Sequence, residues 1–141
     1  MSNLSWAAIK RLVYARANGC CEYCQTCEAN TGQTLHIEHI DPNGGNVFEN
    51  LCLSCANCNL HKAKATQFPD PLTKIVVPLY NPRPQMWHEH FAWDKSGVYI
   101  EGLSETGRAT IDRLKMNDAK IIFARGRWAS GGYHPPKQST D

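Results

Sequence analysis

The fold is decided by residues 34–62, which read TLHIEHIDPNGGNVFENLCLSCANCNLHK. At the start of this stretch Leu35 and Ile37 alternate with polar neighbours, as in a half-buried strand. Residues 41–46 are rich in Asp, Pro, Asn and Gly, which favour turns, and the chain becomes apolar again over residues 51–53. These two apolar runs predict a hairpin whose strands are joined by a long loop.

A helix is expected on each side of this hairpin. The following helix begins within residues 56–65 and ends before Pro69, because proline cannot continue a helix. Before the hairpin, Ser5 can cap a helix over residues 5–18. The expected apolar face of that first helix consists of Trp6, Ile9 and Val13.

The sequence predicts an α+β fold in two parts. Residues 1–68 form a core of helix, hairpin and helix, and residues 69–141 form an α+β extension packed on that core, with a loose tail from about residue 130. In the extension we expect strands at residues 74–80 and within 91–101, helices at 106–116 and 118–127, and an amphipathic strand around His88 and His90.

The composition indicates one compact domain in a reducing compartment. The chain has 141 residues, 42% hydrophobic and 20% charged, with a formal net charge of +2 and seven cysteines. No apolar run approaches the roughly 18 residues of a membrane span, and the first residues mix charge into the apolar pattern, unlike a secretory signal. We therefore expect a cytoplasmic protein without a membrane segment, whose closely spaced cysteines bind metal rather than form disulfides.

The cysteines form two groups with the spacing of a zinc site: Cys20, Cys21, Cys24 and Cys27, then Cys52, Cys55 and Cys58. A CxxC turn places two thiolates on one side of a knuckle, about 2.3 Å from the same ion. Each group offers two overlapping pairs, with Cys27 and Cys52 as the rival ligands. We favour Cys21, Cys24, Cys55 and Cys58, because Cys52 lies within an expected strand. The alternative is a set of buried thiols without metal.

Five polar residues between the cysteine pairs suggest a reaction site: His36, Glu38, His39, Asn50 and Asn59. Mg²⁺ or Mn²⁺ prefers carboxylate and amide oxygens, which Glu38 and Asn59 supply, and keeps waters that a phosphate can replace. Such an ion stabilises charge on a phosphodiester, and His39 can deprotonate the attacking water. His36 shares a strand face with Glu38, and either reaches the metal or a phosphate, or is simply solvated.

The sequence resembles the HNH endonucleases of the ββα-metal class. The matching motifs are Cys21-Glu-Tyr-Cys24, His36-Ile-Glu-His39-Ile-Asp-Pro42, Gly44-Gly45, Asn50-Leu-Cys-Leu-Ser-Cys55-Ala-Asn-Cys58-Asn59 and Lys62, within about residues 11–66. The resemblance implies a zinc-stapled ββα-metal core in which His39 is the general base, and Glu38 takes the metal-ligand place where the family usually has Asp. It makes Asn50 the residue that braces the hairpin and Asn59 the third motif residue, often His in the family. The implied activity is hydrolysis of DNA phosphodiesters to 5′-phosphate and 3′-hydroxyl ends at an HNN-type site.

Basic residues close to this unit are candidates for contacts with the DNA backbone: Lys62, Lys64, Arg11 and Arg16. A lysine on a helix surface is more often just solvated. The sequence is compatible with a monomer or a homodimer.

Two other functions are open at this point. One is a zinc-stapled nucleic-acid-binding module without catalysis, which uses the same helix and hairpin. The neighbouring acid and base, Glu38 and His39, favour the enzyme, because a pure binding module needs no acid next to a base. The other is a disulfide-stabilised extracellular protein, which predicts no free thiols.

Overall fold

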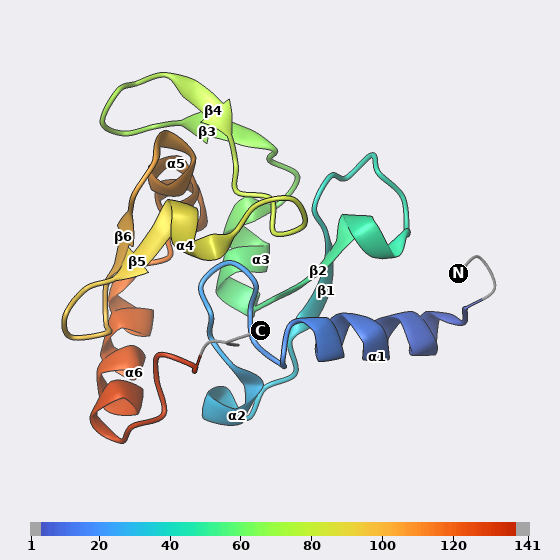
Figure 1. Ribbon diagram of the computed structural model, residues 1–141, viewed down its shortest axis with the longest axis horizontal. Coiled ribbons are helices and arrows are strands. Elements are labelled where there is room, and N and C mark those ends of the chain that lie inside the picture. The colour runs from blue at the N-terminus through green and yellow to red at the C-terminus, as the bar shows by residue number, and fades with distance from the viewer. Residues whose placement is uncertain (1–3, 138–141) are drawn as a thin grey trace.

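The computed structural model describes residues 4–137 as a mixed α+β protein of helices and short antiparallel sheets (Figure 1). In chain order its elements are α1 (Trp6–Arg16), α2 (Glu28–Thr31), β1 (His36–His39), the 3-10 helix η1 (Phe48–Asn50), β2 (Leu51–Ser54), α3 (Ala56–Lys62), β3 (Gln67–Pro69), β4 (Val76–Pro78), α4 (Trp87–His90), β5 (Phe91–Trp93), β6 (Ile100–Gly102), α5 (Glu105–Leu114) and α6 (Ala119–Ser130). Within these residues the strands pair as β1–β2, β3–β4 and β5–β6. The α+β class is confirmed.

The hairpin of β1 and β2 is antiparallel and lies where the alternating pattern predicts it. Its register places Glu38 opposite Cys52 and His39 opposite Leu51. All four residues of β2 are buried, whereas His36 at the start of β1 is exposed and the rest of β1 is half-buried. The helix α3 begins two residues after β2, whereas a long loop that includes η1 separates β1 from β2 (Figure 1).

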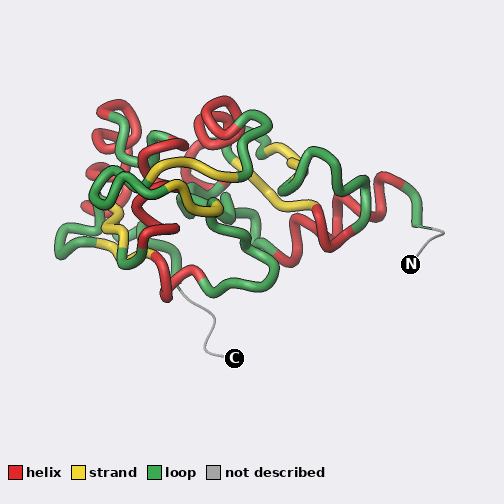
Figure 2. The backbone as a smooth tube through the Cα atoms, turned by 90° about the horizontal axis from the view of Figure 1, so that it is seen from above, coloured by secondary structure: helices red, strands yellow, loops and turns green. Residues whose placement is uncertain are grey.

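The helix α1 begins at its predicted cap but projects beyond the core. The Ser5 side chain accepts a hydrogen bond from Ala8 N at 3.1 Å. Val13 is the fully buried residue of this helix, whereas Trp6 is 46% exposed. The expected apolar face is therefore wrong at Trp6, because the first turns of α1 extend away from the rest of the molecule (Figures 1 and 2).

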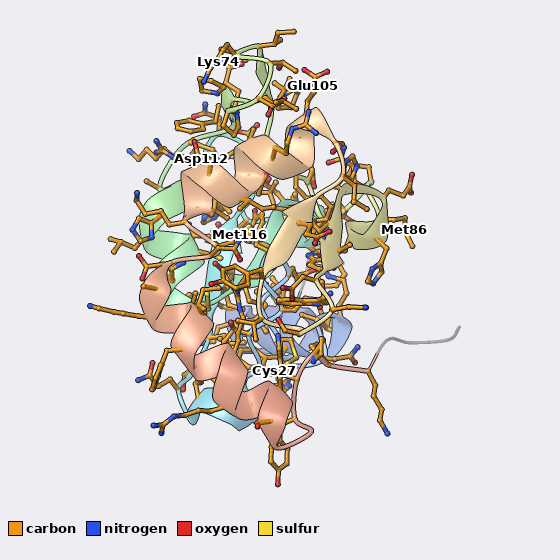
Figure 3. All side chains as sticks on the ribbon, turned by 90° about the vertical axis from the view of Figure 1, so that its left-hand side faces the viewer. Cys27, Lys74, Met86, Glu105, Asp112 and Met116 are labelled. Carbon is orange, nitrogen blue, oxygen red and sulfur yellow. A yellow bond between two sulfur atoms is a disulfide. The ribbon has the colours of Figure 1, made fainter. Side chains whose placement is uncertain are left out.

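The C-terminal part contains the expected helices, with two corrections among the strands. The strand expected at residues 74–80 is shorter, and it pairs with β3, which the sequence did not indicate. The segment around His88 and His90 is the one-turn helix α4 rather than a strand. The helices α5 and α6 begin at the capping residues Ser104 and Asp118, and together they cover the face of the molecule opposite α1 (Figure 3).

One hydrophobic cluster joins the two parts of the chain. It includes Val13, Leu51 and Leu53 from the first part and Phe91, Ala109 and Leu114 from the second. Trp87 Nε1 also donates a hydrogen bond to Tyr23 O at 2.7 Å, across 64 positions of sequence. The boundary expected between residues 68 and 69 falls within β3, so the two parts share both a core and a sheet.

Residues 131–137, where the sequence predicts a loose tail, make several contacts with the body of the protein, although most of them are exposed. Tyr133 N donates to Trp128 O at 2.8 Å, and Tyr133 O accepts from Asn30 Nδ2 at 3.1 Å. The His134 ring is buried, with its centroid 4.5 Å from that of Trp93. The end of the expected tail, residues 138–141, lies outside the described residues.

The buried His134 predicts a loss of stability in mild acid. Burial lowers the pKa of His134 to about 4, whereas in the unfolded chain the group titrates near about 6.5. Between these values the unfolded state binds more protons, so the free energy of unfolding should decrease as the pH falls from about 6.5 to about 4. Urea denaturation over this range should show a smaller decrease for His134→Phe. Equal decreases in wild type and variant would contradict the assignment.

Candidate metal centre and neighbouring polar site

Four buried cysteines form one cluster. The sulfur atoms of Cys21, Cys24, Cys55 and Cys58 lie within 4.8 Å of one another, and none of these residues is more than 7% exposed. The first pair lies in the turn after α1, and the second pair lies at the start of α3. Main-chain amides point at two sulfurs, since Cys24 N donates to Cys21 Sγ and Cys58 N donates to Cys55 Sγ, both at 3.5 Å. These are the four cysteines that the spacing favours.

The dimensions and the chemistry of this cluster suit zinc. Four bonds of about 2.3 Å in a tetrahedron place the sulfurs about 3.8 Å apart, and the Cys24 and Cys55 sulfurs are 3.5 Å apart. Thiolates are soft ligands that select zinc over hard cations. A complete set of four protein ligands is typical of structural rather than catalytic zinc. The cluster can therefore bind a metal ion such as zinc.

The pKa values of three clustered thiols, Cys21, Cys24 and Cys58, are shifted in different directions. Hydrogen bonds with Cys21, Cys55 and Cys58 lower the pKa of Cys24 well below its ordinary value. Burial raises the pKa of Cys21, and hydrogen bonds with the other thiols, first Cys21, raise that of Cys58. A bound metal needs all four as thiolates, so binding must release the protons that the other thiols retain.

The other cysteines lie outside the cluster. Cys20 and Cys27 form a disulfide that closes the loop carrying the first two clustered cysteines. The expectation that these cysteines form no disulfide is therefore wrong for this pair, which an antiparallel bridge brings together. Cys52 Sγ donates instead to the Tyr23 hydroxyl at 3.6 Å, and burial raises its pKa to about 11. Both rival ligands, Cys27 and Cys52, have other partners.

Glu38 on β1 and Asn59 on α3 lie in contact. With its amide nitrogen toward Glu38, Asn59 donates to both carboxylate oxygens, at 3.2 Å for Oε1. Partial burial raises the pKa of Glu38, while the charges of Lys62, His39 and His36 oppose this shift. The strand and the helix thus bring together the carboxylate and the amide that the sequence assigns to a hard cation.

Asn50 holds the loop between the two strands. Its Oδ1 accepts from Asp41 N, while its Nδ2 donates to Asp41 O and Gly45 O, all at 2.9 Å. A Cβ at Gly44 would lie 2.6 Å from the Asn50 side chain, so glycine is required for this close approach. Asn50 thus makes the loop contacts expected of a bracing residue.

The His39 ring is hydrogen-bonded to this same loop. His39 Nε2 lies 2.5 Å from Asn46 Oδ1. The main chain directly after His39 is held as well, since Ile40 N donates to Asn50 O at 2.8 Å. His39 thus has a fixed backbone and one held ring nitrogen.

Lys62 is buried, which corrects its expected role in binding DNA, and Arg16 is half-buried with its guanidinium held by main-chain carbonyls. Lys62 is 2% exposed, and its Nζ donates to Ile40 O at 2.9 Å. Arg16 donates to Phe48 O at 3.1 Å and to Leu51 O at 2.5 Å, and its guanidinium lies 3.8 Å from the centroid of the Phe48 ring. Both cations instead hold main-chain carbonyls at the two ends of the hairpin loop.

The remaining candidates for contact with a ligand are on the surface. His36, Lys64 and Arg11 are all exposed. His36 lies at the start of β1, Arg11 lies in the middle of α1, and Lys64 follows the end of α3. Of the four basic residues proposed from the sequence, Arg11 and Lys64 are thus accessible to a polyanion.

The sequence did not identify several residues that hold the site together. Asn46 lies in a run of turn-forming residues, and this composition indicated a turn but no contact with His39. Arg83 forms an ion pair with Glu22, whose carboxylate also accepts from Leu53 N at 2.8 Å. These contacts tie the cysteine knuckle to β2 and to a segment 61 positions away, and no local pattern signals a contact over such a separation.

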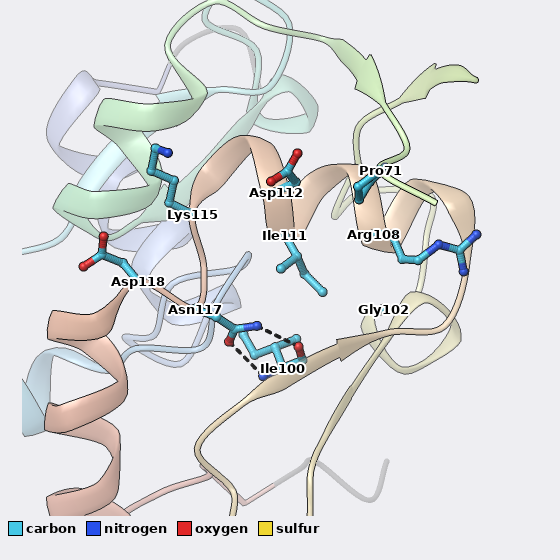
Figure 4. Close-up of a pocket in the computed structure, with 9 residues that line it drawn as sticks. All are labelled: Pro71, Ile100, Gly102, Arg108, Ile111, Asp112, Lys115, Asn117 and Asp118. Carbon is cyan, nitrogen blue, oxygen red and sulfur yellow. Dashed lines mark hydrogen bonds between the residues drawn. The ribbon is translucent and has the colours of Figure 1, made fainter. Parts of the chain in front are cut away.

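A cavity of about 460 Å³ lies apart from this site, between β6, α5 and the start of α6 (Figure 4). Asn117 on its wall donates to Ile100 O and accepts from Ile100 N, both at 2.9 Å. Arg108 forms a bidentate ion pair with Asp70. These polar groups of the cavity wall are thus engaged with neighbouring residues.

Removal of the metal should destabilise the fold, because the binding free energy of a structural metal is part of the folding free energy. We expect about one zinc per chain in the purified protein, and a lower melting temperature after chelation. Cys58→Ser should lose the zinc, while the matched variant Cys52→Ser should retain it. Metal analysis by atomic absorption with thermal denaturation provides the measurement, and a Cys58→Ser protein with full zinc content would contradict the ligand set.

The thiol count tests the disulfide separately. In denaturant with a chelator and without reductant, five thiols should react with a chromogenic disulfide reagent, because Cys20 and Cys27 are joined. After reduction all seven cysteines should react. Seven reactive thiols before reduction would show that Cys20 and Cys27 are free.

Two further observations bear on what kind of protein this is. Among residues 4–137, no helix has both the length and the apolar character that crossing a membrane requires. Comparison of the chain with protein-family models, with curated proteins and with solved structures finds no match in any of the three. The geometry of the site therefore carries the functional argument.

Proposed function

We propose that this protein is a metal-dependent DNA endonuclease of the HNH type, with structural zinc at the four cysteines and Mg²⁺ or Mn²⁺ at Glu38 and Asn59. The observation that carries the proposal is the contact between Glu38 of β1 and Asn59 of α3. Glu38 directly precedes His39 in the sequence. The acid and the amide are thus in contact, and the base follows the acid in the order that the HNH resemblance implies.

The cysteine cluster supports this proposal through its position. Cys55 caps α3 and Cys58 lies in its first turn, so a metal at the cluster fixes the helix that carries Asn59. The other two ligands flank Glu22, whose main-chain nitrogen donates to Leu53 O of β2 at 2.9 Å. A two-stranded hairpin is marginal by itself, so zinc would hold the helix and the hairpin in one fixed arrangement.

The contact between Glu38 and Asn59 suits a hard divalent cation. Carboxylate and amide oxygens are the ligands that Mg²⁺ prefers. With the nitrogen of Asn59 toward Glu38 the pair is hydrogen-bonded. With the amide oxygen turned inward, two acceptors face each other, which is unfavourable unless a cation lies between them. When bound, the cation would stabilise negative charge on the phosphate oxygens. Rotation of the Asn59 amide thus exchanges a hydrogen-bonded pair for a pair of metal ligands.

His39 is the general base in this proposal. Ile40, the next residue, is anchored on both sides, since its nitrogen donates to Asn50 O and its oxygen accepts from Lys62 Nζ. The backbone that carries the imidazole is therefore held in place. A neutral imidazole can take the proton of the water that attacks the phosphodiester.

The proposed substrate is DNA, which the resemblance implies and the distribution of charge allows. The net charge is only +2, so attraction to phosphates has to come from local cations. Exposed Arg11 on α1 and exposed Lys64 after α3 are the cations we propose for phosphate contacts.

Nicking of supercoiled plasmid tests the proposal. Wild-type protein should nick plasmid when Mg²⁺ or Mn²⁺ is added and should stop when EDTA is added. His39→Ala should lower the rate by about 100- to 10,000-fold, because it removes the general base. Glu38→Gln should lower it as well, since the cation loses its anionic ligand.

The matched control is His88→Ala, the same substitution at an exposed histidine of α4, which should cleave like wild type. Zinc content and circular dichroism should be equal in all variants, so that a loss of activity is not a loss of folding. Nicking by a His39→Ala protein at the wild-type rate would refute the assignment. Tight DNA binding by wild type without cleavage in either metal would favour the non-catalytic binding module.

A further inference from the structure

We propose that Asn46 is a positioning residue that fixes the ring of His39 and leaves Nδ1 as the atom that takes the proton from water; this rests on the endonuclease function proposed above. His39 Nε2 lies 2.5 Å from Asn46 Oδ1. An amide oxygen can only accept, so Nε2 carries the proton of the neutral ring, and the lone pair is at Nδ1.

Asn46 is the one described hydrogen-bond partner of the His39 ring, among residues 4–137. His39 is the last residue of β1, and the strand fixes its backbone but not the rotation of its side chain. Without Asn46 the imidazole can turn about its side-chain bonds and exchange its proton between the two nitrogens. The partner on one ring nitrogen thus decides which nitrogen can act as a base.

The loop that carries Asn46 is itself held firmly. Asn50 makes three hydrogen bonds to this loop, one of them to the carbonyl of Gly45, the residue directly before Asn46. Gly45 has a φ of +75°, a conformation that glycine adopts without strain. Asn50 therefore acts on His39 through two routes, by accepting from Ile40 N with its main-chain oxygen and by placing Asn46 beside the ring.

The hydrogen bond between Asn46 and His39 is of a kind that orients catalytic imidazoles in other enzymes. A group that accepts a hydrogen bond from one ring nitrogen fixes the tautomer and the orientation, and the other nitrogen does the chemistry. Loss of such an outer partner at histidine sites typically costs about 10- to 100-fold in function. Asn46 is not one of the residues proposed to hold the cation, and its side-chain oxygen contacts the His39 ring, so its effect acts through His39.

Three variants distinguish a role of Asn46 in positioning the His39 ring from a general loss of structure. Asn46→Ala removes the acceptor, and Asn46→Asp keeps an acceptor at the same place. Asn43→Ala changes an exposed asparagine in the same loop, whose main-chain nitrogen donates to Asp41 Oδ1. Each is measured in two ways. The first is ¹⁵N NMR of the imidazole nitrogens in metal-free protein at about pH 8, where an ordinary histidine is neutral. The second is the rate of plasmid nicking with Mn²⁺, separated into kcat and KM.

We expect wild type, Asn46→Asp and Asn43→Ala to show the proton of His39 on Nε2, and Asn46→Ala to show exchange between both nitrogens. We expect kcat of Asn46→Ala to fall by about 10- to 100-fold, with KM unchanged and with most of the rate restored in Asn46→Asp.

Two results would overturn the proposal: a His39 NMR signature in Asn46→Ala identical to that of wild type, or an altered signature with unchanged kcat. A wild-type protein that shows the Nε2 proton and its dependence on Asn46, but does not cleave DNA, would refute the endonuclease function and would support the hydrogen bond that fixes the ring. The NMR measurement therefore separates the failure of this inference from the failure of the function on which it rests.

Discussion

Four sulfur atoms within 4.8 Å of one another are the constraint on which the rest of the structure depends. Two come from a turn that follows α1 and two from the start of α3, so the cluster connects segments about 30 positions apart. Sulfur ligands of a common metal ion replace many weak contacts with a few strong ones, and binding of the ion contributes directly to folding. The direction of α3, and hence the place of Asn59 over the hairpin, follows from this connection.

Two cations stabilise the hairpin loop in a second way. Buried Lys62 and half-buried Arg16 donate to carbonyls at the two ends of the loop, Ile40 on one side and Phe48 and Leu51 on the other. Burial lowers the pKa of both side chains. A buried charge is costly unless it is hydrogen-bonded, and here the carbonyls at the loop ends meet that need. These charges therefore stabilise the hairpin loop, and fewer of the basic residues named from the sequence are exposed than the sequence suggests.

Local patterns predicted much of this architecture. Alternation around Leu35 and Ile37 located β1, the capping residues Ser5 and Asp118 located the starts of two helices, and the cysteine spacing led to the four clustered residues. These features are readable because each depends on residues only a few positions apart. The bracing role of Asn50 came from the resemblance and not from periodicity.

Contacts between distant residues were not predictable in the same way. The burial of Lys62 depends on its reach to Ile40, 22 positions earlier, and the order of residues 131–137 depends on Asn30 and Trp93. The sheet of β3 and β4 requires a pairing that no alternation indicates. The Asn46 contact with His39 spans seven positions across a turn-rich loop, where composition indicates a turn but not which side chain faces inward.

The C-terminal part of the chain also affects how a metal would leave. Trp87 Nε1 donates to Tyr23 O and Trp93 Nε1 donates to Gln25 Oε1, so two indoles hold the residues on either side of Cys24. Both tryptophans belong to the part beyond residue 69, and the cluster beneath them is almost fully buried. Opening of the knuckle that carries Cys21 and Cys24 would therefore require both indole hydrogen bonds to break. The release of an ion bound at the cluster would then depend on motion of the C-terminal part as well as on the four sulfurs.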